Sequence, residues 1–187
     1  MPTPAEPRAA AVQTASTVDI SELCVYFNAA GAFQGFQPWA GTGVAISPTR
    51  VLTAAHLARC VVQGLYLELP DGSNAHANVL WLDRARDIAM LTIPEGALGS
   101  AAPPAIAEAV VGERVCARVA HPVPAFVCGE VTVVGEDAAA FTAPIQPGNS
   151  GGGVYDATGH LLGVVSKFTA SGGIFAIVKA ADIASVR

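Results

Sequence analysis

The chain has 187 residues, a net charge of −5 at pH 7, and 52% hydrophobic residues against 13% charged ones. This length and composition fit one large domain or two small packed lobes, and they exclude an intrinsically disordered chain. The acidic balance and the lack of a lysine and arginine cluster argue against a nucleic-acid partner.

The N-terminal segment, residues 1–17, is rich in alanine, proline and threonine and is expected to be a flexible leader. It contains no apolar stretch of the kind found in a secretory signal. No run in the chain is long enough to cross a bilayer, so no membrane partner is expected. We therefore expect a cytoplasmic protein, with secretion left open if a leader has been removed.

From Ile20 onward, short runs rich in β-branched residues alternate with Gly, Pro, Asn and Asp, a pattern typical of antiparallel sheets. Six such runs precede a link rich in proline and alanine near residues 96–104, namely 24–27, 42–47, 50–54, 64–69, 77–83 and 87–93. Six more follow it, namely 113–120, 126–135, 140–145, 151–156, 161–168 and 173–178. Helical periodicity is limited to one turn after Thr53 and to the tail 179–186.

This pattern predicts an all-β fold of two six-stranded antiparallel β-barrels with a short C-terminal helix. The N-terminal barrel is expected in residues 18–98 and the C-terminal barrel in residues 99–187.

The four cysteines, at positions 24, 60, 116 and 128, form neither a CxxC pair nor a zinc-ligand spacing. No metal or cofactor is expected, because the sequence has no metal-ligand cluster and no glycine-rich nucleotide loop. Cys116 and Cys128 lie in neighbouring runs and could face each other across a hairpin. Whether they form a disulfide stays open, because they would remain thiols in a reducing compartment.

Three short stretches carry residue types used in nucleophilic catalysis: TAAH, which ends at His56, DIAMLTI, which begins at Asp87, and PGNSGG, which contains Ser150. Taken singly, each has an ordinary explanation, as a packed histidine, a turn aspartate or a loop serine. Taken together, they meet the needs of acyl transfer. A serine hydroxyl needs an imidazole to accept its proton, and the imidazole needs a carboxylate to fix its tautomer. We therefore expect Ser150 to be the nucleophile, His56 the general base and Asp87 its orienting acid.

These stretches resemble the three motifs of the chymotrypsin-like, or trypsin-fold, serine peptidases, over about residues 20–183. Within this family, the residues around the motifs are most similar to those of the bacterial HtrA/Deg-type peptidases. No PDZ module, such as those proteins carry, is expected here, because the sequence ends at Arg187. The resemblance implies a serine endopeptidase that acts on a protein or peptide through an acyl-enzyme. It also implies that Gly148, Asn149 and Ser150 form the oxyanion loop.

By the same resemblance, Ser166 would bond to Asp87, and residues 166–168 would pair with the substrate backbone as an added strand. The specificity pocket would be lined by Pro144, Ile145, Gln146, Ser166, Lys167, Phe168, Gly173 and Phe175. Residues 138–155 contain no Asp or Glu, so the pocket lacks the carboxylate that a Lys or Arg side chain would need. Ile145 and Phe168 are expected to narrow it. We therefore expect a preference for small or medium aliphatic residues, such as Ala or Val, before the scissile bond.

Asn149 is a departure from the digestive-type relatives, which carry an aspartate there that pairs with a new N-terminus after activation cleavage. No such cleavage is expected. Whether activity is controlled by the ordering of loops 121–130 and 144–148, by a partner or by a fused domain is left open. Two alternatives are kept. One is a catalytically inactive trypsin-fold binding module, which ranks below the active peptidase because all three triad residues are present. The other is a processing peptidase released from a viral or phage precursor.

Overall fold

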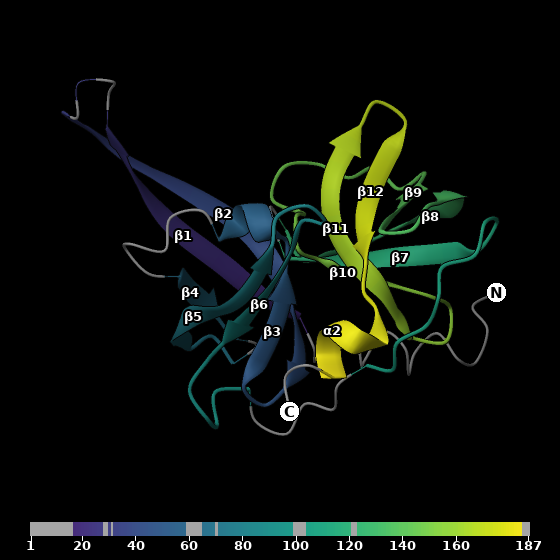
Figure 1. Cartoon of the computed structure of the whole chain (residues 1–187), viewed down its shortest axis with the longest axis horizontal. Helices are drawn as coiled ribbons and strands as arrows, with labels where there is room; N and C mark the ends of the chain where they lie inside the picture. The colour runs from purple at the N-terminus through teal and green to yellow at the C-terminus, as the bar shows by residue number, and fades with distance from the viewer. Residues whose placement is uncertain are drawn as a thin grey trace.

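The computed structural model describes residues 17–27, 30, 32–58, 65–69, 71–98, 104–120 and 123–184. These residues fold into two closed antiparallel barrels of six strands each, which lie side by side in Figure 1. The expected all-β, two-barrel fold is therefore confirmed. The expected division of the chain at residues 98 and 99 stays a prediction, since residues 99–103 lie outside the described part.

The first barrel has the strand order β1-β2-β3-β6-β5-β4 and the second β10-β11-β12-β9-β8-β7. The strands of the first are β1 (Thr17–Phe27), β2 (Phe33–Ser47), β3 (Arg50–Thr53), β4 (Leu65–Glu68), β5 (Asn74–Asp83) and β6 (Ile88–Thr92). Those of the second are β7 (Arg114–Val119), β8 (Ala125–Val134), β9 (Ala138–Phe141), β10 (Gly153–Tyr155), β11 (Leu161–Thr169) and β12 (Gly172–Ile177).

Two short helices complete the described chain. A 3-10 turn, η1 (Ala55–Leu57), follows β3, and the helix α2 (Ala180–Ala184) follows β12, so both helical segments expected from the sequence are present. Among the described residues, no helix is long and apolar enough to cross a membrane.

Alternation of buried and exposed side chains explains how the strands form closed barrels. In β4, Leu65 and Leu67 point into the first barrel while Tyr66 and Glu68 point outward. Each barrel has its own buried apolar cluster. A third cluster joins side chains of both barrels, among them Leu52 and Met90 from the first and Tyr155 and Leu161 from the second. This third cluster fixes the barrels against each other at the seam.

The first two strands are longer than the sequence indicates. β1 begins at Thr17, at the edge of the expected leader, and residues 1–16 lie outside the described part. β2 begins at Phe33, well before the expected run 42–47, and runs through Gly41. A Cβ at Gly43 would lie 2.6 Å from the Val51 side chain, so glycine here makes room for close packing within the barrel.

Cys116 and Cys128 face each other on β7 and β8 and form a disulfide. The hairpin expected from the sequence is thus confirmed, and the open question of their pairing is answered. Disulfides persist mainly in oxidising compartments. The cytoplasmic location stays a prediction, with this disulfide weighing against it. Cys60 lies outside the described residues.

Candidate active site

The three predicted catalytic residues lie at the seam between the barrels. His56 is in η1 and Asp87 is in the turn before β6, both in the first barrel, whereas Ser150 is in the turn before β10 in the second. The Ser150 carbonyl accepts a hydrogen bond of 2.8 Å from the backbone N–H of Thr42 on β2. In the other direction, the Ser166 hydroxyl on β11 donates to Asp87 Oδ2 at 2.5 Å. Each half of the site is therefore bonded to the opposite barrel.

Asp87 and His56 form a tightly bonded pair. The His56 Nδ1 lies 2.9 Å from Asp87 Oδ2 and 3.1 Å from Oδ1. The backbone N–H of His56 also donates to Oδ1 at 2.9 Å, and that of Ala55 donates to the Asp87 carbonyl at 3.2 Å. A carboxylate can only accept, so Nδ1 carries the proton and Nε2 is left as the basic nitrogen. The imidazole is thereby set up as a general base.

The Asp87 carboxyl is held in its charged form. Its burial favours the neutral acid, but hydrogen bonds from His56 and Ser166 outweigh this effect, so the pKa of Asp87 lies below its ordinary value. The side chain is 15% exposed, which keeps these bonds largely shielded from water. An ionised Asp87 is what the orienting role requires.

Asn149 holds the loop that carries Ser150. Its side-chain Oδ1 accepts from the Gln146 N–H at 3.0 Å, and its own N–H donates to the Gln146 carbonyl at 3.1 Å. The residue is fully buried. Its N–H is therefore occupied and does not point to an oxyanion, so Asn149 supports the loop from within.

The N–H groups of Gly148 and Ser150 differ from that of Asn149. Neither donates to any acceptor in the described part of the chain. Gly148 and Gly151, on either side of the serine, have positive φ angles of 92° and 79°. Such a turn can present successive N–H groups to one anion, as an oxyanion hole requires.

Ser150 and His56 are not hydrogen-bonded to each other among the described residues. Contacts of this kind are often long without substrate and shorten when it binds. Close packing nevertheless joins their surroundings: a Cβ at Gly41 would lie 3.0 Å from the Ser150 carbonyl oxygen and 2.3 Å from the side chain of Leu57, next to His56.

The predicted pocket residues fall into two groups. Ile145 and Gly173 are brought together, since a Cβ at Gly173 would lie 2.4 Å from the Ile145 side chain. Pro144 and Gln146 are exposed beside Ile145 in the sequence, and Lys167 is exposed on β11 after the bonded Ser166. The second group contains the two aromatic residues.

Phe175 and Phe168 are placed differently from the expectation. Phe175 is fully buried and packs edge to face against Phe141, with ring centroids 5.5 Å apart, inside the barrel core. It is therefore a core residue, because an inward position on a barrel strand is filled by packing and not by substrate. Phe168 is 58% exposed, so it does not narrow an enclosed pocket.

Two residues at the seam were not singled out by the sequence. Thr42 bonds to Ser150 from the opposite barrel, and the only signal for it is a polar residue between two glycines. The side chain of Arg86, next to Asp87, bonds to Ile177 and Asp182, which are more than 90 positions away. No local pattern marks such a partner.

Comparisons with known proteins agree with the two-barrel fold. The family model of the trypsin-like peptidase domain matches residues 41–164. A search of curated proteins found no match. Many solved structures have a similar fold, among them a variant of the HtrA-type protease AlgW with a decapeptide, at a TM-score of 0.75 and 19% identity, covering 92% of this chain and 62% of that one.

Two further structures give the same result. The serine endoprotease from Yersinia pestis has a TM-score of 0.74 and 21% identity, covering 100% of this chain and 66% of that one. AlgW with a decapeptide has a TM-score of 0.73 and 20% identity, covering 95% and 65%. The chain thus spans just under two thirds of the length of these proteins, and at these identities the likeness concerns the fold.

Proposed function

Because the chain belongs to the trypsin-like peptidase domain family, we propose that it is a serine endopeptidase with His56, Asp87 and Ser150 as its catalytic residues. The observation that carries the proposal is the His56–Asp87 pair, bonded to Ser166 of the second barrel and set beside the loop of Ser150. A peptide substrate is supported by the decapeptide named with the AlgW structures.

In the first half of the proposed reaction, Ser150 Oγ attacks the carbonyl carbon of the scissile peptide bond, and its proton moves to Nε2 of His56. Asp87 accepts the Nδ1–H bond throughout and stabilises the imidazolium. The C–N bond then breaks, the proton passes from His56 to the leaving amine, and an ester links Ser150 to the acyl part of the substrate.

In the second half, water attacks this ester and gives a proton to His56, which returns it to Ser150 Oγ as the acid product leaves. The negative charge on the carbonyl oxygen develops twice, once in each half. The N–H groups of Gly148 and Ser150 are proposed to receive it, because both are free of described acceptors.

The preference for a small or medium aliphatic residue before the scissile bond is part of the proposal. It is supported by the absence of any Asp or Glu from residues 138–155. A buried cationic side chain would lack a partner in such a pocket.

The nucleophile can be tested with a fluorophosphonate probe, which reacts with activated serines. We expect the chain to be labelled, Ser150→Ala to lose labelling, and its peptidase rate to fall by at least about 10³-fold. Ser73→Ala is the matched control, because Ser73 lies in an exposed turn bonded to Asp71. A folded wild-type chain that is never labelled would favour the inactive binding module.

The pocket can be tested by profiling cleavage of a peptide library. We expect Ala and Val before the cleaved bond and expect Gly173→Ala to reduce cleavage, since the added methyl group would overlap the side chains of Ile145 and Phe141. A strong preference for Lys or Arg would rule out this assignment while leaving the proposed triad intact.

A further inference from the structure

The backbone of Asp87 is strained. Its φ angle of 59° makes it the one non-glycine residue with positive φ in the described part of the chain. A side chain in this conformation costs on the order of 1–3 kcal/mol and persists only where its surroundings hold it. The conformation matters for function, because it sets the direction in which the carboxylate leaves the turn toward His56.

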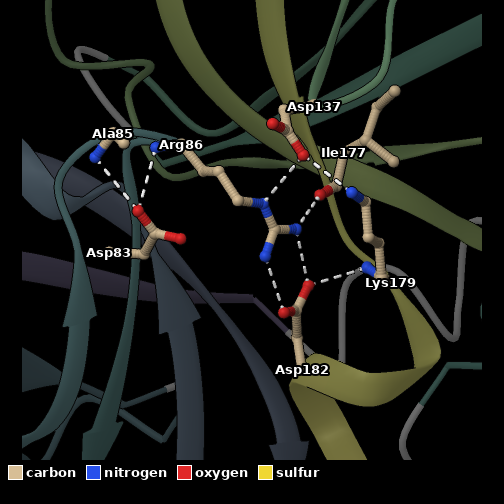
Figure 2. A network of polar contacts seen from close by, with 7 residues as sticks. All are labelled: Asp83, Ala85, Arg86, Asp137, Ile177, Lys179 and Asp182. Atoms are coloured by element: carbon tan, nitrogen blue, oxygen red, sulfur yellow. Dashed lines mark hydrogen bonds and ion pairs between the residues drawn. The ribbon is translucent and has the colours of Figure 1, made fainter.

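The turn before Asp87 is partly fixed from within. Asp83 Oδ1 accepts hydrogen bonds from the backbone N–H groups of Ala85 and Arg86, at 3.0 and 3.1 Å (Figure 2). These bonds tie the turn to the end of β5. They do not connect it to the second barrel, where Ser166 lies.

The Arg86 side chain makes that connection. Its Nη1 and Nη2 bond to the two carboxylate oxygens of Asp182 on α2, both at 2.8 Å, and Nη2 also donates to the Ile177 carbonyl at 2.8 Å (Figure 2). Nε lies 3.4 Å from Asp137 Oδ1. All three partners belong to the second barrel or to the helix that follows it. The guanidinium therefore docks the turn onto the opposite half of the molecule.

The geometry and burial of this contact set it apart from an ordinary surface ion pair. The side chains of Arg86 and Asp182 are only 15% and 12% exposed, and the contact is bidentate. Asp182 is itself fixed, since the Lys179 N–H donates to its Oδ2 at 2.8 Å. Bidentate pairs that are shielded from water have a defined geometry, whereas exposed pairs contribute little.

Arg86 and Asp87 are consecutive and bond to neighbouring strands of the second barrel. Asp87 bonds to Ser166 on β11, and Arg86 bonds to Ile177 at the end of β12, which pairs with β11. We propose that Arg86 is a positioning residue that holds the strained turn against the second barrel and thereby aims Asp87 at His56. Only the catalytic consequence of this inference depends on the proposed peptidase function.

The test compares three variants with the wild type. Arg86→Met keeps most of the length of the side chain without its hydrogen-bond donors. Arg86→Lys keeps the charge but not the guanidinium group that makes the bidentate contact. Arg84→Met is the control, because Arg84 is exposed in the same turn and makes none of these contacts. Thermal unfolding first shows that each variant is folded.

The first measurement is the NMR resonance of the His56 Nδ1–H proton, which its bond to the Asp87 carboxylate shifts downfield. We expect this resonance to move upfield or broaden in Arg86→Met, to be partly restored in Arg86→Lys, and to be unchanged in Arg84→Met. An unchanged resonance in folded Arg86→Met would overturn the proposal. This measurement needs no catalytic activity, so it stands even if the wild type fails to react with the fluorophosphonate and the proposed function is wrong.

The second measurement is the rate of fluorophosphonate labelling. Misplacement of a catalytic group by about 1 Å costs up to about 10²-fold in rate. We expect kinact of Arg86→Met to fall by about 10- to 100-fold with little change in KI. In an Asp87→Asn background, Arg86→Met should cause no further fall, and an equal further fall would contradict action through Asp87. If Arg86→Met does not fold, Asp182→Asn removes the same charge pair and is read by the same criteria.

Discussion

Thr42 joins three parts of the active-site region through three different atoms. Its N–H donates to the Ser150 carbonyl at 2.8 Å, and its Oγ1 accepts from the N–H of Ala120, after β7, at 2.9 Å. Its carbonyl accepts from Thr53 Oγ1 on β3 at 2.8 Å. The residue is fully buried, so none of these partners can be replaced readily by water. A single residue of the first barrel thus bonds to the nucleophile loop through its backbone and to the end of β7 through its side chain.

Thr42→Val tests this role, because valine has nearly the same shape but cannot accept a hydrogen bond. The N–H of Ala120 would lose its partner, so we expect a loss of about 1–3 kcal/mol in the free energy of unfolding, measured by urea denaturation. Thr42→Ser keeps the hydroxyl and serves as the control, with a loss of less than about 1 kcal/mol from the missing methyl group. Equal losses in the two variants would show that the hydroxyl bond contributes nothing.

The order of the elements could be predicted from the sequence because strand and turn signals are local. All twelve expected runs correspond to strands, and both helical segments are present. The boundaries were less predictable. Gly41 lies inside β2 although it is outside the expected run 42–47, and the expected run 140–145 ends as a strand at Phe141. A sequence pattern cannot distinguish a glycine that turns the chain from one that admits a neighbour.

The nucleophile loop shows this limit at the active site. A Cβ at Gly151 would lie 1.9 Å from the Thr42 carbonyl oxygen and 2.2 Å from Thr53 Oγ1, and its φ is 79°. Both requirements come from tertiary contacts with the first barrel. The motif around Ser150 was visible in the sequence, but the reason for this glycine and the internal bonds of Asn149 were not. The same holds for Arg86 and Asp182, which are 96 residues apart.

At the scale of the whole molecule, the candidate site depends on how the two barrels meet. The apolar cluster at the seam includes Val44 and Met90 from the first barrel and Val164 and Ala176 from the second. Polar bonds also cross the seam, among them those from Thr42 to Ser150, from Ser166 to Asp87, and from Arg86 to Asp182. Apolar burial supplies most of the attraction, whereas the polar bonds fix the register of one barrel on the other.

Two of these crossing bonds involve carboxylates, so their strength should depend on pH. Burial favours the neutral acid of Asp182, but bonds from Arg86 and the Lys179 N–H outweigh it, and the pKa of Asp182 lies below its ordinary value of 3.8. The pKa of Asp87 is lowered in the same way. A group with a lowered folded pKa stabilises the fold above its unfolded pKa, and this contribution is lost as pH falls through the folded pKa.

We therefore expect Asp182→Asn to reduce the free energy of unfolding by about 1–3 kcal/mol at pH 7. The difference in the free energy of unfolding between Asp182→Asn and the wild type should narrow once the pH drops below about 4, because the carboxylate then begins to be protonated in the unfolded wild-type chain. Urea denaturation at pH 7, 5 and 3 measures this gap. Asp71→Asn is the control, since Asp71 lies in an exposed turn bonded to Ser73, away from the seam, and should change stability little at any of these pH values. A gap that stays constant from pH 7 to pH 3 would mean that the Asp182 charge does not hold the barrels together.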